Sequence, residues 1–436
     1  MKRKALSFLI RWKNKNSHKP LIIRGARQVG KTWLMKAFGK EFYSQCAYIN
    51  FDGNKAMQSL FADNFDISRI ILGLEIETNL KIQPHSTLIL FDEIQECPQA
   101  LKSLKYFQEN APEYDIIAAG SLLGVSLHSG VSFPVGKVEF LDLYPLDFEE
   151  FLDAQGESRL LEAILQLNFP LMRAFNTTYI DLLRQYFFIG GMPEAVQEFA
   201  NNRDFTAVRS IQKNILNAYQ QDFSKHIPTE IVTRSRMLWN AIPGQLAKEN
   251  RKFVFGAMKK GARWAEYETA LNWLSDCGLI YQINRISKPD LPLCAYERRN
   301  EFKLFLLDVG LLGALSNLSV KTLLEGNSVY EEFKGALTEQ YVLEQLKVIP
   351  DLPICYWSND TSSAELDFIV QNEQNIVPVE VKASINLRAK SMQSYCNHFS
   401  PVQCVRTSLA DYKLSGALHD IPLYAIGQLK NILNKE

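Results

Sequence analysis

Short apolar runs alternate with longer stretches of helical periodicity over residues 21–150. The runs read LIIRG, AYINF, TLILFDE, DIIAAGS and KVEFLDLYPL. Strands that are apolar along most of their length are buried on both faces, which is typical of a parallel sheet covered by helices. In such sheets the functional loops follow the carboxyl ends of the strands. The pattern therefore predicts an α/β domain at the start of the chain.

The periodicity changes after residue 152. Residues 155–240 space apolar residues three and four apart, which predicts a run of helices. The next part predicts two helices and then an apolar hairpin, GLIYQINRI with EFKLFLLDVGLL, an order that indicates a winged helix. The last part predicts a helix, FKGALTEQYVLEQLK, and two strands, AELDFIV and VPVEVKAS. We therefore expect four domains, at residues 1–152, 153–240, 241–320 and 321–436.

The charge balance indicates no general affinity for nucleic acid. The 436 residues contain 48 Lys and Arg against 48 Asp and Glu, so a nucleic-acid contact has to be a local patch. The first 20 residues are basic and contain no acid. We interpret them as a solvated amphipathic helix that turns Leu6, Leu9 and Ile10 inward, with a local nucleic-acid contact as the alternative.

The cysteines and the lengths of the apolar runs indicate a cytoplasmic protein without a membrane partner. Seven cysteines are scattered without a CxxC pair, which is typical of free thiols in a reducing compartment. No apolar run approaches the roughly 18 residues of a spanning helix, and the short apolar run ALSFLI does not resemble a secretory signal.

The loop after the first apolar run has the spacing G-x-x-x-x-G-K-T. Its residues are Gly25, Ala26, Arg27, Gln28, Val29, Gly30, Lys31 and Thr32. Glycines let successive backbone N–H groups face a polyphosphate, and the helix that follows adds its positive end. Lys31 is then placed for the β- and γ-phosphates of ATP, and Thr32 for Mg²⁺. An ordinary turn is the alternative interpretation.

Two acids end the third apolar run. Asp92 and Glu93 follow TLILF, where buried carboxylates require a cation. Asp92 suits the Mg²⁺ shell. Glu93 is placed to orient or deprotonate an attacking water, which indicates hydrolysis rather than transfer to a small acceptor. Ser121, at the end of the next run, is a polar group suited to that water or to the γ-phosphate.

These motifs resemble the AAA+ family of P-loop ATPases. RGARQVGKT together with YPLDFEEF and GGMPEAV is similar to the bacterial and archaeal AAA+ proteins that carry a C-terminal DUF4143 domain. The resemblance implies an ATPase core, a helical lid, ATP with Mg²⁺ and a sensor role for Ser121. Related chains often have an arginine finger before the last core strand, where this chain has Gly136 and Lys137. A lysine lacks the planar fork of arginine, so activation by a neighbouring subunit does not follow from the resemblance.

The two strands near the carboxyl end place a second set of charges together. A hairpin of AELDFIV and VPVEVKAS brings Asp367 beside Glu380, and strand alternation turns Lys382 to the same face as Glu380. Two carboxylates can hold Mg²⁺, while the lysine can activate a water for attack on a phosphodiester. Glu339, on the preceding helix, is a candidate to complete the acidic set.

This second spacing resembles the PD-(D/E)xK core of restriction-endonuclease-like domains. It implies a metal-dependent nuclease coupled to the ATPase, with nucleic acid as partner. Two alternatives stay open: an exposed acid and lysine on an edge strand, and an ATP-gated switch or scaffold that binds nucleic acid or protein without cleavage. The resemblance also leaves open a homo-oligomer or another protein partner.

Overall fold

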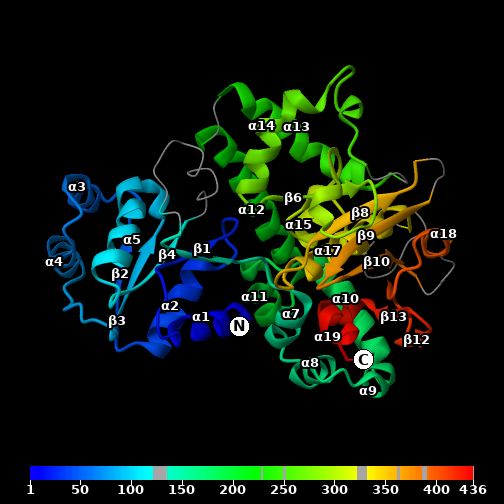
Figure 1. Cartoon of the computed structure of the whole chain (residues 1–436), viewed down its shortest axis with the longest axis horizontal. Coiled ribbons are helices and arrows are strands. Elements are labelled where there is room, and N and C mark those ends of the chain that lie inside the picture. Colours follow the sequence, from blue (N-terminus) through cyan, green and yellow to red (C-terminus); the bar gives the residue numbers. More distant parts are fainter. Residues whose placement is uncertain are drawn as a thin grey trace. The chain divides into compact units, whose positions relative to one another are not determined.

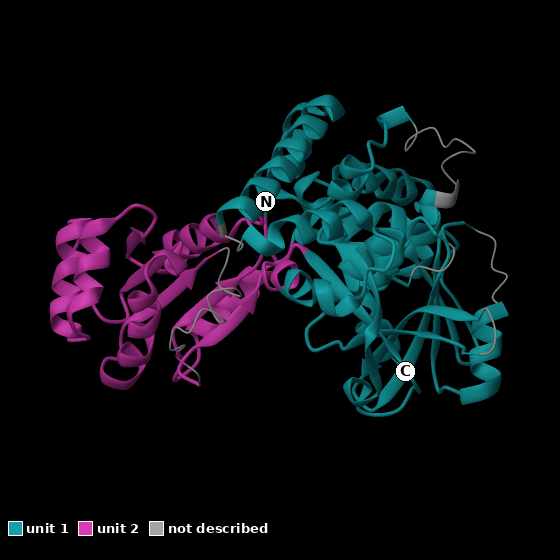
Figure 2. Cartoon of the chain, turned by 90° about the horizontal axis from the view of Figure 1, so that it is seen from above, with its two compact units in different colours: residues 1, 145–272, 280–436 teal, residues 2–144, 273–279 magenta. Residues whose placement is uncertain are grey.

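A computed structural model describes residues 1–120, 134, 136–226, 229–248, 252–321, 331–360, 364–384 and 390–435. The chain divides into two units, which are coloured separately in Figure 2. Unit 1 contains residues 1, 145–272 and 280–436, and unit 2 contains residues 2–144 and 273–279. Among the described residues, no helix is both long and apolar enough to cross a membrane.

The amino-terminal strands of unit 2 pair in parallel, as their apolar runs predict (Figure 1). Their order in the sheet is β2-β3-β4-β1-β5, so the first strand lies between the fourth and the fifth. The strands are β1 (Leu21–Arg24), β2 (Gln45–Asn50), β3 (Thr87–Asp92), β4 (Asp115–Ala119) and β5 (Glu139–Asp142). The carboxyl ends of β1 and β3 therefore bring the glycine-rich loop and the two acids to the same edge of the sheet.

Among the described residues of unit 2, five helices and one 3₁₀ turn accompany this sheet. They are α1 (Ala5–Lys13), α2 (Lys31–Phe42), α3 (Lys55–Asp63), α4 (Ile67–Thr78), η1 (Ile94–Glu96) and α5 (Pro98–Asn110). The core between sheet and helices contains three aromatic rings, Phe51, Phe61 and Phe91, which meet edge to face. Such contacts favour one arrangement of the rings, so the packing of Phe91 fixes the position of the end of β3.

Unit 1 begins with the helical run that the spacing predicts. Its helices are α7 (Phe148–Ala154), α8 (Ser158–Leu165), α9 (Phe169–Ala174), α10 (Asn176–Ile189), α11 (Pro193–Asn202), α12 (Phe205–His226) and α13 (Thr229–Leu246). Helix α14 (Trp264–Asp276) follows a short 3₁₀ turn, η2 (Phe255–Ala257). Two later helices, α15 (Val309–Leu315) and α17 (Glu331–Lys347), pack against each other.

The GGMPEAV motif forms the break between α10 and α11. Gly191 leaves no room for a side chain, because a Cβ there would lie 2.0 Å from the Leu146 oxygen. Its N–H donates to Asp308 Oδ2 at 2.5 Å, and Asp308 also caps α15 through Leu311 N–H. Burial raises the pKa of Asp308 to about 6, while the backbone donors oppose that rise. The motif is therefore a packed junction inside unit 1.

An eight-stranded mixed sheet completes unit 1, in the order β12-β13-β11-β10-β9-β8-β6-β7. Its strands are β6 (Ile280–Ile286), β7 (Glu297–Leu306), β8 (Ile354–Ser358), β9 (Glu365–Asn372), β10 (Asn375–Val381), β11 (Cys404–Ser408), β12 (Lys413–Ser415) and β13 (Leu418–Pro422). Helix α18 (Lys390–Phe399) connects β10 to β11, and η3 (Leu293–Tyr296), η5 (Leu423–Gln428) and α19 (Leu429–Leu433) are the remaining elements.

The hairpin that indicated a winged helix exists, but it is not a separate wing. Strands β6 and β7 pair antiparallel as expected. Strand β6 also pairs with β8 through Arg285 and Tyr356, so the hairpin extends the carboxyl-terminal sheet. The four-domain division stays a prediction. The strand pattern showed two neighbouring strands, whereas the partner of β6 lies about 70 residues further along the chain, beyond the reach of any local pattern.

Candidate functional site

The glycine-rich loop adopts a backbone that only a few residue types tolerate. Gly25 and Gly30 have φ angles of 144° and 94°, and Gln28 has a φ of 66°. A Cβ on Gly25 would lie 2.2 Å from the Leu143 oxygen, so glycine is required there for space as well as for conformation. Gly30 is also the N-cap of α2. The loop therefore leads into a helix amino terminus, which is the arrangement that binds phosphate groups.

Lys31 lies inside this loop rather than in solvent. Its side chain is 8% exposed, and Nζ donates to the carbonyl oxygens of Gly25 and Ala26 at 2.9 and 2.7 Å. Burial lowers the pKa of Lys31 to about 8, an effect that the nearby carboxylates of Glu93 and Asp92 oppose. The ammonium is held by neutral oxygens, so an anionic phosphate in the loop would be a stronger partner for it.

The magnesium candidates meet as the sequence predicts. Thr32 Oγ1 donates to Asp92 Oδ2 at 2.8 Å, although 60 residues separate them. Asp92 is 4% exposed, and its Oδ1 accepts the Glu93 N–H at 3.1 Å. A hydroxyl and a carboxylate oxygen in contact are hard ligands of the kind that Mg²⁺ takes beside nucleotide phosphates. The residues present therefore fit Mg²⁺ with a nucleoside triphosphate.

Tyr48 is a contact that sequence reasoning missed. Its hydroxyl donates to Asp92 Oδ2 at 2.9 Å from the neighbouring strand β2. The aspartate raises the pKa of the tyrosine hydroxyl, after the larger effect of burial. In the sequence, the only signal was the tyrosine of the AYINF run. A single tyrosine does not indicate which strand lies beside β2.

Glu93 follows Asp92 in a left-handed conformation, with a φ of 50°. Such backbone costs about 1 kcal/mol or more for a residue other than glycine, and it is often found at functional sites. Gln95 Nε2 donates to Glu93 Oε2 at 2.6 Å, which orients the carboxylate. The turn directs Glu93 differently from Asp92, so the two acids are suited to different tasks.

Two further sequence predictions have different outcomes. Ser121 lies outside the described residues, so its sensor role stays a prediction. Lys137, at the position where related chains have a finger arginine, pairs with Glu109 at 2.9 Å on the partly exposed surface of unit 2. Within unit 2 this lysine is a surface ion-pair partner.

The basic amino-terminal segment forms the amphipathic helix that we expected, and Lys2, Lys4, Arg11 and Lys15 are exposed. Helix α1 buries Leu9 and Trp12, but Arg3 is also buried, at 8% exposure. Lys15 pairs with Glu139, and Lys19 donates to the Gly136 oxygen. The exception is Arg3, which lies before α1 and is buried, because periodicity gives no information about a distant partner.

Arg3 connects the glycine-rich loop to Tyr144, the last residue of the first segment of unit 2. Its Nη1 donates to the Val29 oxygen at 2.8 Å, and its Nη2 donates to the Tyr144 oxygen at 2.6 Å. Val29 is the residue before Gly30, and Tyr144 is the last residue before unit 1 begins. A guanidinium can hold two carbonyls at once because its donors form a rigid fork.

Replacing Arg3 with glutamine is expected to weaken ATP binding about tenfold, because each lost charged hydrogen bond is worth roughly 1.5–3 kcal/mol and the loop becomes less ordered. Arg3→Lys should weaken binding as well, because an ammonium does not form the fork. Titration of ATP by calorimetry, with the thermal midpoint measured in parallel, tests this. Arg11→Gln, an exposed change on α1, is the control. Unchanged affinity in Arg3→Gln would contradict the role.

A second cluster lies on the β9–β10 hairpin of unit 1. Val379 pairs with Phe368, and the same antiparallel register places Glu380 opposite Asp367. Asp367 Oδ2 accepts the Val381 N–H at 2.7 Å, and Lys382 Nζ lies 2.8 Å from Glu380 Oε1. The juxtaposition of these three side chains is the arrangement that the sequence predicted.

Burial dominates the electrostatics of Glu380. The side chain is 3% exposed, and desolvation raises its pKa. Lys382 and Arg406 oppose that rise, whereas Asp367 adds to it. Within the part of the chain that the structure describes, Glu380 Oε2 is buried without a hydrogen-bond partner. A cation beside this oxygen would satisfy it, so two carboxylates of the predicted metal set fit a divalent ion.

Glu339 contacts a buried lysine. It lies on α17, where its Oε2 is 3.8 Å from Lys303 Nζ, and Lys303 also pairs with Glu365 at 2.6 Å. Lys303 is fully buried, so it supplies a resident cation to both glutamates. No group of three or more His, Cys, Asp or Glu among the described residues is arranged to hold a metal ion. The role of Glu339 as the third acid of the set stays a prediction.

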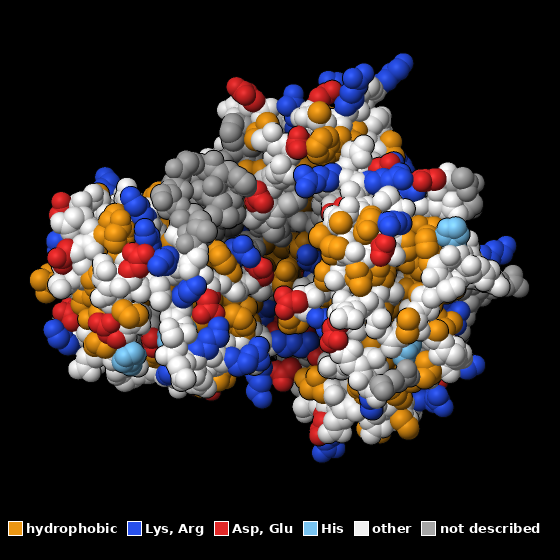
Figure 3. All heavy atoms as spheres, viewed as in Figure 1, with side chains coloured by type: hydrophobic (Ala, Val, Ile, Leu, Met, Phe, Trp, Pro, Cys, Tyr) orange, Lys and Arg blue, Asp and Glu red, His pale blue; other side chains and the backbone are white. Residues whose placement is uncertain are grey.

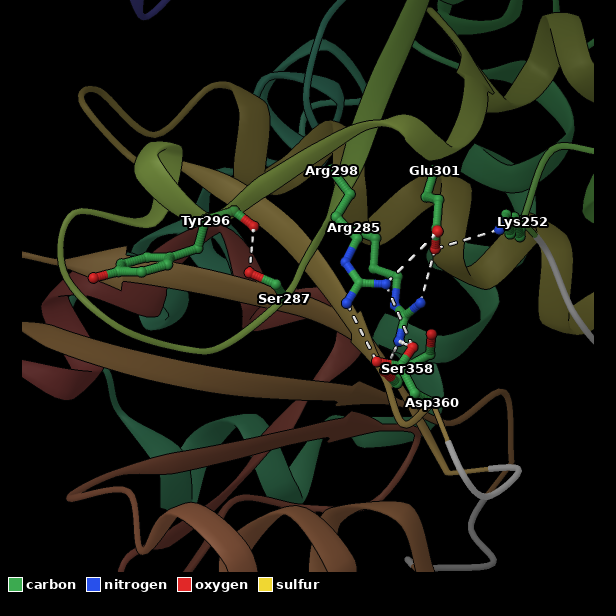
Figure 4. A network of polar contacts seen from close by, with 8 residues as sticks. All are labelled: Lys252, Arg285, Ser287, Tyr296, Arg298, Glu301, Ser358 and Asp360. Carbon is green, nitrogen blue, oxygen red and sulfur yellow. Dashed lines mark hydrogen bonds and ion pairs between the residues drawn. The ribbon is translucent and has the colours of Figure 1, made fainter.

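Three cations and two carboxylates form a network of ion pairs between the β6–β7 hairpin, Lys252 and the residues after β8 (Figure 4). Arg285 donates to Glu301 Oε2 at 2.7 Å, and it also pairs with Asp360. Arg298 reaches Asp360 Oδ2 at 3.2 Å, and Lys252 lies 3.3 Å from Glu301. These contacts tie the β6–β7 hairpin to the residues after β8. On the face seen in Figure 3, basic side chains are likewise interspersed with acids.

Comparisons with known proteins agree with the description of the glycine-rich loop and its parallel sheet. Residues 17–152 match an AAA domain, residues 180–322 match a domain of unknown function, DUF8612, and residues 334–426 match another, DUF4143. No curated protein matches the chain.

The solved structures that resemble the chain are distant. A Walker-type ATPase of Pyrococcus abyssi is 15% identical, with a TM-score of 0.45 over 72% of this chain and 95% of that one. An Aeropyrum pernix ORC1 protein in complex with DNA is 14% identical, with a TM-score of 0.28 over 72% of this chain and 91% of that one. Drosophila ORC bound to DNA is also 14% identical, with a TM-score of 0.29 over 73% of this chain and 95% of that chain.

The parallel sheet, the glycine-rich loop and the family match together define the class of protein: the chain carries a P-loop domain of the AAA type. More particularly, it combines this AAA domain with a DUF4143 domain that contains the β9–β10 hairpin.

Proposed function

We propose that the protein binds and hydrolyses ATP with Mg²⁺ at the glycine-rich loop. The contact between Thr32 and Asp92 carries this proposal, because it assembles two magnesium ligands from distant segments. Lys31 would neutralise the β- and γ-phosphates, Gly30 and the start of α2 would receive them, and Glu93 would accept a proton from the attacking water. Thr32 and Asp92 would hold the Mg²⁺, whose charge would offset that of the phosphate groups.

The test of hydrolysis is Glu93→Gln. We expect this variant to bind ATP with unchanged affinity and to hydrolyse it about 10²–10⁴ times more slowly, because the base is lost while the phosphate contacts stay. Stopped-flow binding and phosphate release measure the two steps separately. Glu96→Gln, an exposed change three residues later, is the matched control. Hydrolysis at the wild-type rate in Glu93→Gln would remove the residue from the mechanism.

We further propose that the DUF4143 domain is a metal-dependent nuclease-like domain coupled to the ATPase and acting on nucleic acid. Support comes from the contact of Lys382 with Glu380 and from the buried Oε2 of Glu380 beside Asp367. In that role the two carboxylates would hold Mg²⁺, and Lys382 would orient or deprotonate the water that attacks a phosphodiester.

A second candidate function is an ATP-gated binding module that does not cut. The contact of Glu339 with the buried Lys303 favours it, since a resident cation competes with a metal ion for this acid. A site with two carboxylates binds a divalent ion less tightly than one with three. The two candidates differ in one observable, which is cleavage that depends on both metal and Lys382.

A further inference from the structure

Two cysteines of the DUF4143 domain lie unusually close together. Cys396 lies on α18, Cys404 is the first residue of β11, and their Sγ atoms are 3.2 Å apart. This is shorter than an ordinary non-bonded contact between sulfur atoms. A disulfide requires about 2.05 Å, so the sulfurs need to move only about one ångström closer.

The backbone holds both residues in place. Ser400 N–H donates to the Cys396 oxygen at 2.9 Å and ends the helix. Cys404 N–H donates to the Ala417 oxygen at 2.7 Å, so it is anchored to the turn between β12 and β13. Tyr395, Met392 and Leu418 pack around the pair. The proximity therefore follows from fixed elements rather than from two free loops.

The two thiols differ in access. Cys396 is partly exposed, whereas Cys404 is 3% exposed. Burial raises the pKa of Cys404, and its hydrogen bond with Cys396 adds to the rise. Cys404 is accordingly the protonated partner, and Cys396 is the thiol that a reagent in solution reaches first.

We propose that Cys396 and Cys404 are a modification site that forms a reversible disulfide by exchange with a small disulfide. The Cys396 thiolate attacks one sulfur of the reagent and displaces the first small thiol. The Cys404 sulfur then attacks Cys396 and displaces the second. The two cysteines are oxidised, the reagent is reduced to two thiols, and these thiols carry away the two cysteine protons.

The cross-link would join α18 to the strand beside the acidic cluster. Cys404 lies two residues before Arg406, and Arg406 is the register partner of Glu380 on β10. Oxidation would close a short loop, residues 396–404, and fix the helix over this end of the sheet. The proposal does not depend on cleavage or on ATP hydrolysis, because it rests on the two sulfurs and their anchors.

The experiment uses the reduced full-length protein in buffers that range from reduced to oxidised glutathione. After acid quenching, free thiols are alkylated in denaturant and the chain is digested with trypsin. Cleavage after Lys390 and Arg406 gives one peptide, residues 391–406, that contains both cysteines. We expect the doubly alkylated peptide to be replaced by a peptide without alkyl groups. Its mass should be that of the reduced, unalkylated peptide less two hydrogen atoms. Dithiothreitol should restore the first form.

Controls separate the native pair from general thiol reactivity. Exposed Cys294 should form only a mixed disulfide with glutathione, and neither Cys396→Ser nor Cys404→Ser should give the lighter peptide. The oxidation equilibrium constant of the native chain should exceed that of the urea-unfolded chain about tenfold or more, because the fold holds the sulfurs together. Two results would overturn the proposal: equal constants in the two states, or glutathione on Cys396 with Cys404 still alkylated.

Discussion

Replacing Lys31 with alanine is expected to reduce ATP affinity about 100-fold or more and to abolish measurable turnover. The ammonium is buried within the loop, where it donates to the oxygens of Gly25 and Ala26. Losing one member of a buried charge pair costs roughly 2–5 kcal/mol, and 1.4 kcal/mol corresponds to a factor of ten. Fluorescent-nucleotide titration and phosphate release measure the two quantities.

Lys40→Ala is the matched control for this prediction. Lys40 lies on the same helix, α2, but it is exposed and distant in sequence from the loop. Both variants remove the same side chain from one helix, so a general loss of helix stability would affect both. ATP turnover that survives in Lys31→Ala would show that the loop is not the catalytic nucleotide site.

The second large effect is expected at Lys382. If the DUF4143 domain cleaves nucleic acid, Lys382→Ala should reduce the rate about 10²–10⁴-fold, which is the usual contribution of a general base or of a charge aimed at the transition state. Asp367→Ala should have a similar effect through loss of the metal. The assay uses supercoiled, linear and single-stranded DNA and RNA, with Mg²⁺ or Mn²⁺, in the presence and absence of ATP.

Lys413→Ala provides the control on the same sheet, because Lys413 is exposed on β12. Including Lys31→Ala shows whether nucleotide binding changes the cleavage, as coupling requires. Cleavage that persists in both Lys382→Ala and Asp367→Ala would come from another site or a contaminant. Binding without cleavage in the wild type, unaffected by either change, would favour the binding module.

Much of the nucleotide site could be predicted because its chemistry is local. Gly25 to Thr32 form one uninterrupted motif, and Asp92 and Glu93 stand out as two acids at the end of an apolar run. The hairpin of Asp367 and Glu380 was predictable for the same reason, since a short turn leaves only one register in which the apolar faces agree. In both cases, neighbours in sequence determine the geometry.

The contacts that could not be predicted join residues far apart in the chain. Arg3 meets Tyr144, Tyr48 meets Asp92, and Glu339 meets Lys303. Lys303 illustrates the difficulty: it belongs to a Glu-x-Lys tripeptide with no distinguishing local context, yet it is fully buried between two glutamates. Periodicity assigns a charged residue to solvent and gives no information about a distant partner.

By itself, the sequence determined the glycine-rich loop before α2, the parallel character of the first sheet and the pairing of the β9–β10 strands. These features depend on glycine spacing, buried apolar runs and strand alternation, all of which act over a few residues. Only the tertiary structure decided that the β6–β7 hairpin extends the carboxyl-terminal sheet, that Arg3 holds the phosphate loop and that Cys396 lies against Cys404. Those features depend on which distant strands and helices pack together, and that is decided by burial across the whole chain.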